Sequence, residues 1–250
     1  GFASEAKAFD KAHEVVHFPP GYYWCNNMFV SYQPLSLYSP ISTMETNRAV
    51  AANKIRILLY ESIFKRIQNT DRSVAFFLSG GLDSSIIASV AAKILHPNKI
   101  ETYSIGTSEQ DSPDLLAANQ VADHIGSNHH VILFSPETLF GKIETTVKAI
   151  ESYDCTTVRA SVPMYALSEY VSTHTDHKVI LSGEGADELF GGYLYFHNAP
   201  NEEAFQEETI RLCRDVHMYD VLRADRCTAA HGLELRVPFF DKAFVEYVVS

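Results

Sequence analysis

The most informative part of the sequence is VAFFLSGGLDSS, residues 74–85. Its first half, Val74–Leu78, is a continuous apolar run, which is typical of a strand buried on both faces of a parallel sheet. The glycine pair Gly80-Gly81 ends the run, and a helix is predicted from Ser84 to Leu95. Glycines let a backbone approach a bulky anion, and a helix N-terminus supplies free N–H groups with a partial positive charge. The stretch therefore predicts an anion-binding loop. It is not a Walker P-loop, because the pattern GxxxxGKS or GxxxxGKT is absent.

Outward from this stretch, strands and helices alternate along the chain. Further strands are predicted at Ile100–Ile105, Val131–Phe134 and Lys178–Leu181. Further helices are predicted at Asn47–Gln68, between the N-cap Ser112 and the stop at Gly126, after Ser135, and at Val162–Thr173. This alternation predicts an α/β fold, a doubly wound parallel sheet with helices on both faces. In such sheets, ligands bind outside the carboxyl ends of the strands.

Residues 1–40 differ in character and predict a short β extension. Glu14–Phe18 and Tyr22–Tyr32 are candidate strands, joined by a turn at Pro19-Pro20-Gly21 in which proline presets the bend. Ser36–Ser42 is a candidate linker. We therefore expect two parts, residues 1–40 and residues 41–250, with the main sheet in the second.

A second glycine-rich loop is LSGEGADELFGGY, residues 181–193, which follows the predicted strand at Lys178–Leu181. It holds three carboxylates, Glu184, Asp187 and Glu188, among four glycines. Like charges so close repel one another unless a cation or a positive substrate lies among them. Glu184 and Asp187 are three residues apart, so one helical turn would aim both the same way, although Glu188 could pair with Glu184 instead. Both glycine loops come at strand carboxyl ends, which predicts that they form one site.

Composition excludes several classes of function. Lys and Arg number 20 against 31 Asp and Glu in 250 residues, a net charge of −11, which disfavours nucleic-acid binding. No apolar run approaches the roughly 18 residues of a membrane span. The four cysteines lack the spacing of a zinc site, and the sequence has no glycosylation sequon or signal-peptide core, so we expect a cytoplasmic protein.

The two loops resemble a known family. SGGLDSS resembles the pyrophosphate-binding loop of the ATP pyrophosphatases, and SGEGADELFGGYLYF, residues 182–196, resembles a signature of the synthetase domain of B-type asparagine synthetases. Further similar segments are residues 2–8, 18–22, 156–165, 217–220 and 234–241. The resemblance implies an adenine nucleotide alpha hydrolase-like fold for residues 41–250. It also implies that residues 1–40 are the end of an amidotransferase domain.

The resemblance further implies a reaction and a set of site residues. In the family, the aspartate side chain attacks the α-phosphorus of MgATP, pyrophosphate leaves, and ammonia converts the β-aspartyl-adenylate into asparagine and AMP. Glu184 matches the catalytic glutamate, and Asp83 and Asp187 match the Mg²⁺ ligands. The implied ATP-binding residues are Leu78, Ser79, Gly80, Gly81, Asp83, Ser84, Ser85, Ile105, Ser182 and Gly183. Ammonia would come from glutamine in the full-length enzyme, and a homodimer is left open.

Two departures from the family pattern keep alternatives open. Residue 1 is Gly and the first cysteine is Cys25, so the family's N-terminal cysteine nucleophile is missing, as is its lysine beyond the segment 234–241. We therefore expect a fragment of a longer glutamine-dependent enzyme. The alternatives are a β-lactam-forming synthetase and a non-catalytic nucleotide-binding domain.

Lesser candidates lie outside the two loops. Arg159 could bind a substrate carboxylate or make a structural ion pair, and His129-His130 is interpreted as structural rather than metal-binding. Arg236 and Asp241 are interpreted as architectural. The aromatic residues Tyr193, Tyr195 and Phe196, with His197, are interpreted as packing.

Overall fold

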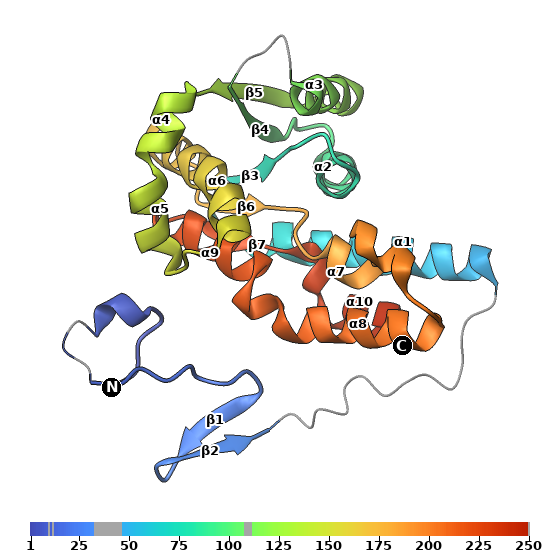
Figure 1. The fold of residues 1–250 in the computed structure, drawn as a ribbon. Coiled ribbons are helices and arrows are strands. Elements are labelled where there is room, and N and C mark those ends of the chain that lie inside the picture. Colours follow the sequence, from blue (N-terminus) through green and yellow to red (C-terminus); the bar gives the residue numbers. More distant parts are fainter. Residues whose placement is uncertain (10, 12, 33–46, 108–111, 250) are drawn as a thin grey trace. The chain divides into compact units, whose positions relative to one another are not determined.

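The computed structural model of the chain describes residues 1–9, 11, 13–32, 47–107 and 112–249. These residues divide into two compact units, one before residue 33 and one after residue 46. The candidate linker Ser36–Ser42 lies outside the described residues. The second unit contains the main sheet and most of the helices (Figure 1).

The first unit contains one short helix, η1 (Ala6–Ala8), and an antiparallel hairpin of β1 (Tyr22–Cys25) and β2 (Met28–Ser31). The hairpin turns at Asn26 and Asn27, whose φ angles of 48° and 60° are left-handed. Asparagine tolerates this conformation, and two such residues form the turn that matches strand twist. The prediction of one strand over Tyr22–Tyr32 was therefore wrong, as was the strand at Glu14–Phe18, which has no regular structure.

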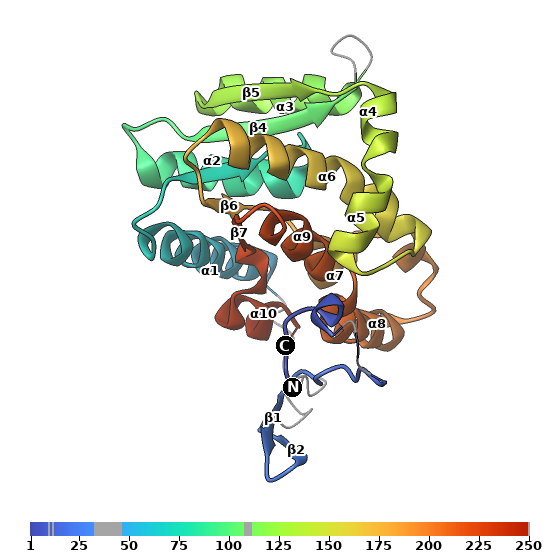
Figure 2. The ribbon, with the colours of Figure 1, turned by 90° about the vertical axis from the view of Figure 1, so that its left-hand side faces the viewer.

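The sheet of the second unit has five parallel strands in the order β5-β4-β3-β6-β7 (Figures 1 and 2). The strands are β3 (Val74–Phe77), β4 (Glu101–Gly106), β5 (Asn128–Leu133), β6 (Val179–Leu181) and β7 (Glu234–Arg236). Four of them confirm predicted strands. β7 was not predicted, because its three residues include Glu234 and Arg236 and carry no apolar run.

The strand order places a topological switch point in the middle of the sheet. From β3 the chain moves outward to β4 and β5 on one side, and then returns to β6 on the other side of β3. Phe76 pairs with Leu181, so the two glycine loops leave the sheet at the same level. Ligands of doubly wound sheets bind at such a crevice. The fold therefore brings the loops together as predicted.

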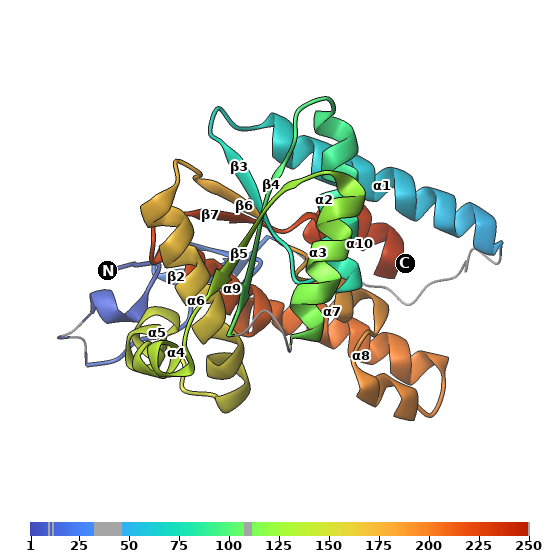
Figure 3. The ribbon, with the colours of Figure 1, turned by 90° about the horizontal axis from the view of Figure 1, so that it is seen from above.

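Helices cover both faces of the sheet (Figure 3). α1, α2 and α3 lie on one side, and α4, α5, α6 and α9 lie on the other. The bounds are α1 (Arg48–Gln68), α2 (Leu82–Leu95), α3 (Pro113–Ile125), α4 (Pro136–Gly141), α5 (Ile143–Ile150), α6 (Cys155–His174), α7 (Ala186–Phe190), α8 (Glu202–Asp215), α9 (Asp220–Ala229) and α10 (Lys242–Val249). Short 3-10 turns occur at η3 (Leu194–Asn198), η4 (Val216–Met218) and η5 (Pro238–Phe240). No helix in the described ranges has both the length and the apolar character that crossing a membrane requires.

Local sequence signals account for several helix ends. The Asn47 side chain accepts hydrogen bonds from the N–H groups of Ala49 and Val50 at the start of α1. Ser112 caps α3, and Gly126 ends it in the left-handed conformation, both as predicted. α6 begins seven residues earlier than predicted, at Cys155, where the Asp154 side chain accepts from Thr157 N at 2.8 Å.

The core between the sheet and α6 is formed by buried apolar side chains. They are Ala75, Phe77, Tyr103, Leu167, Val171, Ile180 and Leu233. On β3, the side chains alternate between the two faces, yet Ala75, Phe76 and Phe77 are all buried. β3 is therefore covered on both faces, which is why its sequence is a continuous apolar run rather than an alternating one.

Asp241 connects the end of the chain to α1. Its carboxylate accepts from Arg66 Nη1 at 3.2 Å and from Lys65 Nζ at 3.3 Å, and the side chain is 13% exposed. Burial opposes ionisation here, but the hydrogen bonds and charges of Arg66 and Lys65 hold the pKa of Asp241 below its ordinary value. This confirms the architectural interpretation of Asp241.

Replacing Asp241 with asparagine is expected to lower the free energy of unfolding by about 1–3 kcal/mol at pH 7, because two charge-assisted hydrogen bonds are lost. A carboxyl group whose pKa is lower in the folded state than in the unfolded state stabilises the fold at pH values above its unfolded-state pKa. This stabilisation is lost as the pH falls and the carboxylate is protonated. The difference between variant and parent should therefore be full above pH 3.8 and shrink as the pH falls below 3.8, through the lower pKa of the folded state. Urea unfolding of both proteins measures this. Asp71→Asn, at a side chain 93% exposed, is the control, and a uniform effect at every pH would contradict the electrostatic explanation.

Candidate active site

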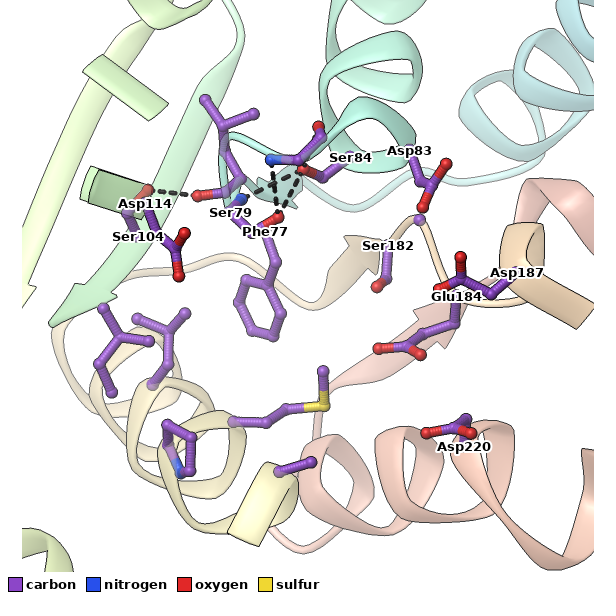
Figure 4. Close-up of a pocket in the computed structure, with 18 of the residues that line it drawn as sticks. Phe77, Ser79, Asp83, Ser84, Ser104, Asp114, Ser182, Glu184, Asp187 and Asp220 are labelled. Carbon is purple, nitrogen blue, oxygen red and sulfur yellow. Dashed lines mark hydrogen bonds between the residues drawn. The ribbon is translucent and has the colours of Figure 1, made fainter. Parts of the chain in front are cut away.

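A cavity of about 560 Å³ lies at the carboxyl ends of β3, β4 and β6 (Figure 4). Both glycine loops contribute to its wall, together with the first turns of α2 and α3 and with residues of α6, α7 and α9. Of the predicted site residues, Leu78, Ser79, Gly81, Asp83, Ser84, Ile105, Ser182, Gly183, Glu184 and Asp187 line it. Gly80 and Ser85 are not among the lining residues.

The first loop is held in shape by its own serines. Ser84 Oγ accepts from Ser79 N at 3.2 Å, and Ser79 Oγ accepts from Gly81 N at 3.2 Å. Ser85 Oγ donates to Gly81 O at 2.6 Å, so this hydroxyl is used within the loop. α2 begins at Leu82 without a side-chain cap, so its first N–H groups remain available to an anion. The loop and helix together form the anion-binding arrangement that the sequence predicts.

Gly80 supports this loop from behind the cavity. Its φ is 82°, and a Cβ at this position would lie 2.5 Å from Ala118 N on α3. Replacing Gly80 with alanine is expected to lower the free energy of unfolding by about 1–3 kcal/mol through backbone strain, with the steric contact added. Affinity for the anion that the loop is predicted to bind should fall with it.

The matched control is Gly141→Ala, because Gly141 has open space around it and lies in α4, where alanine is favoured. Thermal unfolding and titration with inorganic pyrophosphate measure both effects. An alanine at residue 80 that changes neither would contradict this account of the loop.

The second loop packs directly against the first. A Cβ on Gly183 would lie 2.7 Å from Ser84 N and 2.9 Å from the carbonyl carbon of Asp83. Only glycine allows this approach of two backbones. The contact brings residues 182–185 beside the N-terminus of α2.

Asp83 and Asp187 lie near each other at one end of the cavity (Figure 4). Burial, and then the charge of Asp187, raises the pKa of Asp83, while burial and the charge of Asp220 raise the pKa of Asp187. Such a pair is unfavourable unless a cation neutralises it, and carboxylate oxygens are ligands that Mg²⁺ prefers. The described residues include no set of three His, Cys, Asp or Glu side chains arranged to hold a metal. The pair therefore fits a magnesium ion that takes its other ligands from phosphate and water.

Glu184 also lines the cavity, and its side chain is largely buried. Its Oε2 accepts from Arg223 Nη2 on α9 at 3.1 Å, and the side chain is 16% exposed. Burial raises the pKa of Glu184 to about 7, although the charge of Arg223 opposes the rise. Glu184 precedes α7, so no helical turn joins it to Asp187 or to Glu188. Its carboxylate forms an ion pair with Arg223 instead.

Sequence reasoning missed the residues behind Glu184. Arg223 Nε also donates to Asp220 Oδ1 at 2.8 Å, and the Tyr193 hydroxyl donates to Glu188 Oε1 at 2.5 Å and lies 3.4 Å from Asp220 Oδ2. Interpreting Tyr193 as a packing residue was therefore incomplete. The signals for this group were the family-like segment 217–220, which includes Asp220, and the spacing of Asp220 and Arg223, one helical turn.

The opposite end of the cavity is apolar. Phe77, Ile105, Pro163, Met164 and Leu167 line it, and they come from β3, β4 and α6. Ser104 Oγ donates to Leu78 O, which fixes the carbonyl at the edge of this region. A flat apolar ring would fit between these side chains, with its polar substituents toward the loops.

Among the lesser candidates, Tyr193 lines the cavity, whereas Arg159, the His129-His130 pair and Arg236 do not. Arg159 is exposed and is not among the lining residues. His129 Nδ1 is 2.9 Å from Thr102 Oγ1, and His130 Nε2 is 2.7 Å from Glu101 Oε2, which agrees with a structural role for both. Arg236 Nη2 donates to Asn69 O at 3.1 Å and so ties β7 to the end of α1.

Comparison with known proteins identifies the family. The model of the asparagine synthase family matches residues 54–205 and 198–250. Glutamine-hydrolysing asparagine synthetases from Homo sapiens and Pongo abelii are each 51% identical over 202 residues, which are 79% of this chain and 36% of each relative. The Gallus gallus enzyme is 48% identical over the same shares. The chain thus spans about a third of the length of these relatives.

Among solved structures, an NH3-dependent NAD synthetase from Campylobacter jejuni aligns with a TM-score of 0.41 and 15% identity, over 67% of this chain and 78% of that chain. The match to the asparagine synthase family model includes both cavity loops. By this match, the chain belongs to the asparagine synthase family.

Proposed function

We propose that this chain carries out the ATP-dependent amidation of aspartate to asparagine, through a β-aspartyl-adenylate, with release of pyrophosphate and AMP. The observation that carries the proposal is the single cavity that joins the anion-binding loop, an apolar recess and a buried carboxylate near neutral pKa. The relatives are named glutamine-hydrolysing asparagine synthetases, which supports asparagine as the product.

ATP is proposed to lie across the cavity from the apolar recess to the first loop. The adenine ring would occupy the recess beside Leu78 and Ile105, and Ser182 with Gly183 would contact the nucleotide between base and phosphates. Residues 79–85 would hold the β- and γ-phosphates through N–H groups and hydroxyls. A bound Mg²⁺, held by Asp83 and Asp187, would neutralise part of the triphosphate charge.

Activation is needed because a carboxylate oxygen is a poor leaving group and AMP is a good one. The loop N–H groups stabilise the pyrophosphate as it leaves, and the rigid walls hold aspartate in line with the α-phosphorus. Glu184 then accepts a proton from ammonia as the nitrogen attacks the acyl carbon. A carboxyl group whose pKa is about 7 is suited to this step at neutral pH.

The wider setting of this reaction follows from the family. Ammonia is proposed to derive from glutamine in the complete enzyme, and residues 1–40 to be the end of the amidotransferase domain that releases it. A cytoplasmic location and a homodimer are consistent with this proposal.

The proposed function is tested by supplying the complete protein with MgATP and aspartate, with and without ammonium. Pyrophosphate release that requires aspartate, and asparagine that requires ammonium, are the expected results. Nucleotide binding without pyrophosphate release for any amino acid would support a non-catalytic domain instead. Release with β-lactam precursors but not with aspartate would support the β-lactam-forming alternative.

A further inference from the structure

Arg223 is the one basic side chain among the described residues that line the cavity, whose wall also holds six carboxylates. It lies on α9, and its side chain is 13% exposed. A cation so enclosed needs anionic partners, and the choice of partner decides which carboxylate it holds in the charged form.

The guanidinium group of Arg223 binds Glu184 with one edge and Asp220 with the other. Nε donates to Asp220 Oδ1 at 2.8 Å, and Nη2 donates to Glu184 Oε2 at 3.1 Å. Nη1 lies 4.0 Å from the thioether sulfur of Met164. Asp220 lies one turn earlier on the same helix, so it anchors the guanidinium at one edge while the other edge is presented to Glu184.

The other charged groups around Glu184 disfavour its carboxylate form. The carboxylates of Asp187 and Glu188 on α7 and of Asp220 on α9 each disfavour a charge on Glu184, as burial does. Cys227 on α9 interacts with Glu184, Tyr193 shares its hydroxyl between Glu188 and Asp220, and Asp83 on α2 lines the same cavity. Among these groups, only Arg223 favours the carboxylate form of Glu184.

We propose that Arg223, anchored by Asp220, is a positioning residue that keeps the Glu184 carboxylate charged and aimed into the cavity. The inference rests on the proposed function and deepens it. In the second half-reaction, the ammonia lone pair forms the C–N bond and the acyl–oxygen bond to AMP breaks with its electron pair. One proton from nitrogen passes to Glu184 Oε. A protonated Glu184 cannot accept that proton, so the cation beside it sets the pH range in which amidation occurs.

The first test is the titration of Glu184 itself in the complete protein, by NMR of ¹³C-labelled glutamate carboxyl groups, with Glu184→Gln used for assignment. Arg223→Met is expected to raise the midpoint by about 1–3 pH units, the range for losing an opposite charge at close contact. Arg211→Met is the matched control, because Arg211 pairs with Glu208 and Asp215 on exposed α8. An unmoved midpoint in Arg223→Met contradicts the inference.

Arg223→Lys covers the case in which Arg223→Met does not fold. Lysine keeps the charge, but one ammonium does not reproduce the two-edged contact with Asp220 and Glu184. The midpoint should rise by less than in Arg223→Met but measurably above that of the parent. A midpoint equal to the parent's would show that the geometry of arginine has no role.

The second test separates this inference from the proposed function. In Arg223→Met, the acid limb of ammonium-dependent asparagine formation should move up in pH by the same amount. Aspartate-dependent pyrophosphate release should show no such movement. A merely structural role would lower both rates at every pH and leave the limb in place, which would refute the inference alone. A parent protein that releases no pyrophosphate would refute the proposed function.

Discussion

Glu184→Gln is expected to lower ammonium-dependent asparagine formation by about 10²- to 10⁴-fold, the usual contribution of a positioned general base. Glutamine has the shape of glutamate and can still accept from Arg223 Nη2, but it cannot take a proton from the attacking nitrogen. Pyrophosphate release with aspartate alone should change by only a few-fold, because the charge on Glu184 is used after the adenylate has formed.

The control for this prediction is Glu208→Gln. Glu208 also pairs with an arginine, Arg211, at 2.6 Å, but it lies on α8 away from the cavity wall. The Glu208→Gln variant should form asparagine and release pyrophosphate at the same rates as the parent. If Glu184→Gln lowers pyrophosphate release as strongly as asparagine formation, Glu184 acts in binding or folding and not as the base.

Asp187→Asn is expected to lower Mg²⁺-dependent ATP use by at least about 10²-fold at moderate Mg²⁺. Loss of a residue that supports a metal ligand usually costs about 10- to 100-fold in metal affinity or activity. Asp187 is proposed as a direct ligand, so we expect at least the upper end of that range. Asparagine keeps the size of the side chain but removes one of the two charges that face the ion. It also removes the Asp187 charge that raises the pKa of Asp83, so Asp83 should ionise more readily.

The measurement is pyrophosphate release as a function of Mg²⁺ concentration. Partial recovery at high Mg²⁺ is expected, because weaker binding is overcome by mass action. Asp225→Asn, an exposed position on α9, is the control. A Mg²⁺ dependence identical to that of the parent would reject Asp187 as a ligand.

The sequence predicted the elements whose signals are local. β3, the following loop and α2 were recognised because an apolar run, a glycine pair and an amphipathic helix are adjacent in the chain. α3 was recognised from Ser112 and Gly126. β7 was not, because three residues beside a neighbouring strand acquire their identity only by pairing with β6. The hairpin was misplaced because proline and glycine at residues 19–21 gave a stronger turn signal than Asn26 and Asn27.

The candidate site also contains some residues with a local sequence signal and others that are defined only by contacts between distant segments. Glu184 and Asp187 could be selected because clustered acids among glycines are unusual in either a core or a surface, and Asp83 because it lies in the glycine loop that resembles a known family. Arg223 could not, since its contact with Glu184 joins residues 39 positions apart through the packing of α9 beside the sheet. The charge state of Glu184 depends on that contact. Its chemistry therefore becomes visible only in the folded molecule.

The convergence of the two loops on one nucleotide is tested most directly by a crystal structure with α,β-methylene-ATP and Mn²⁺ in place of Mg²⁺. The proposed mechanism predicts one anomalous Mn²⁺ peak bound by Asp83, Asp187 and phosphate oxygens, with the β- and γ-phosphates against residues 79–85. A nucleotide outside the cavity, or an ion that contacts neither aspartate, would contradict it.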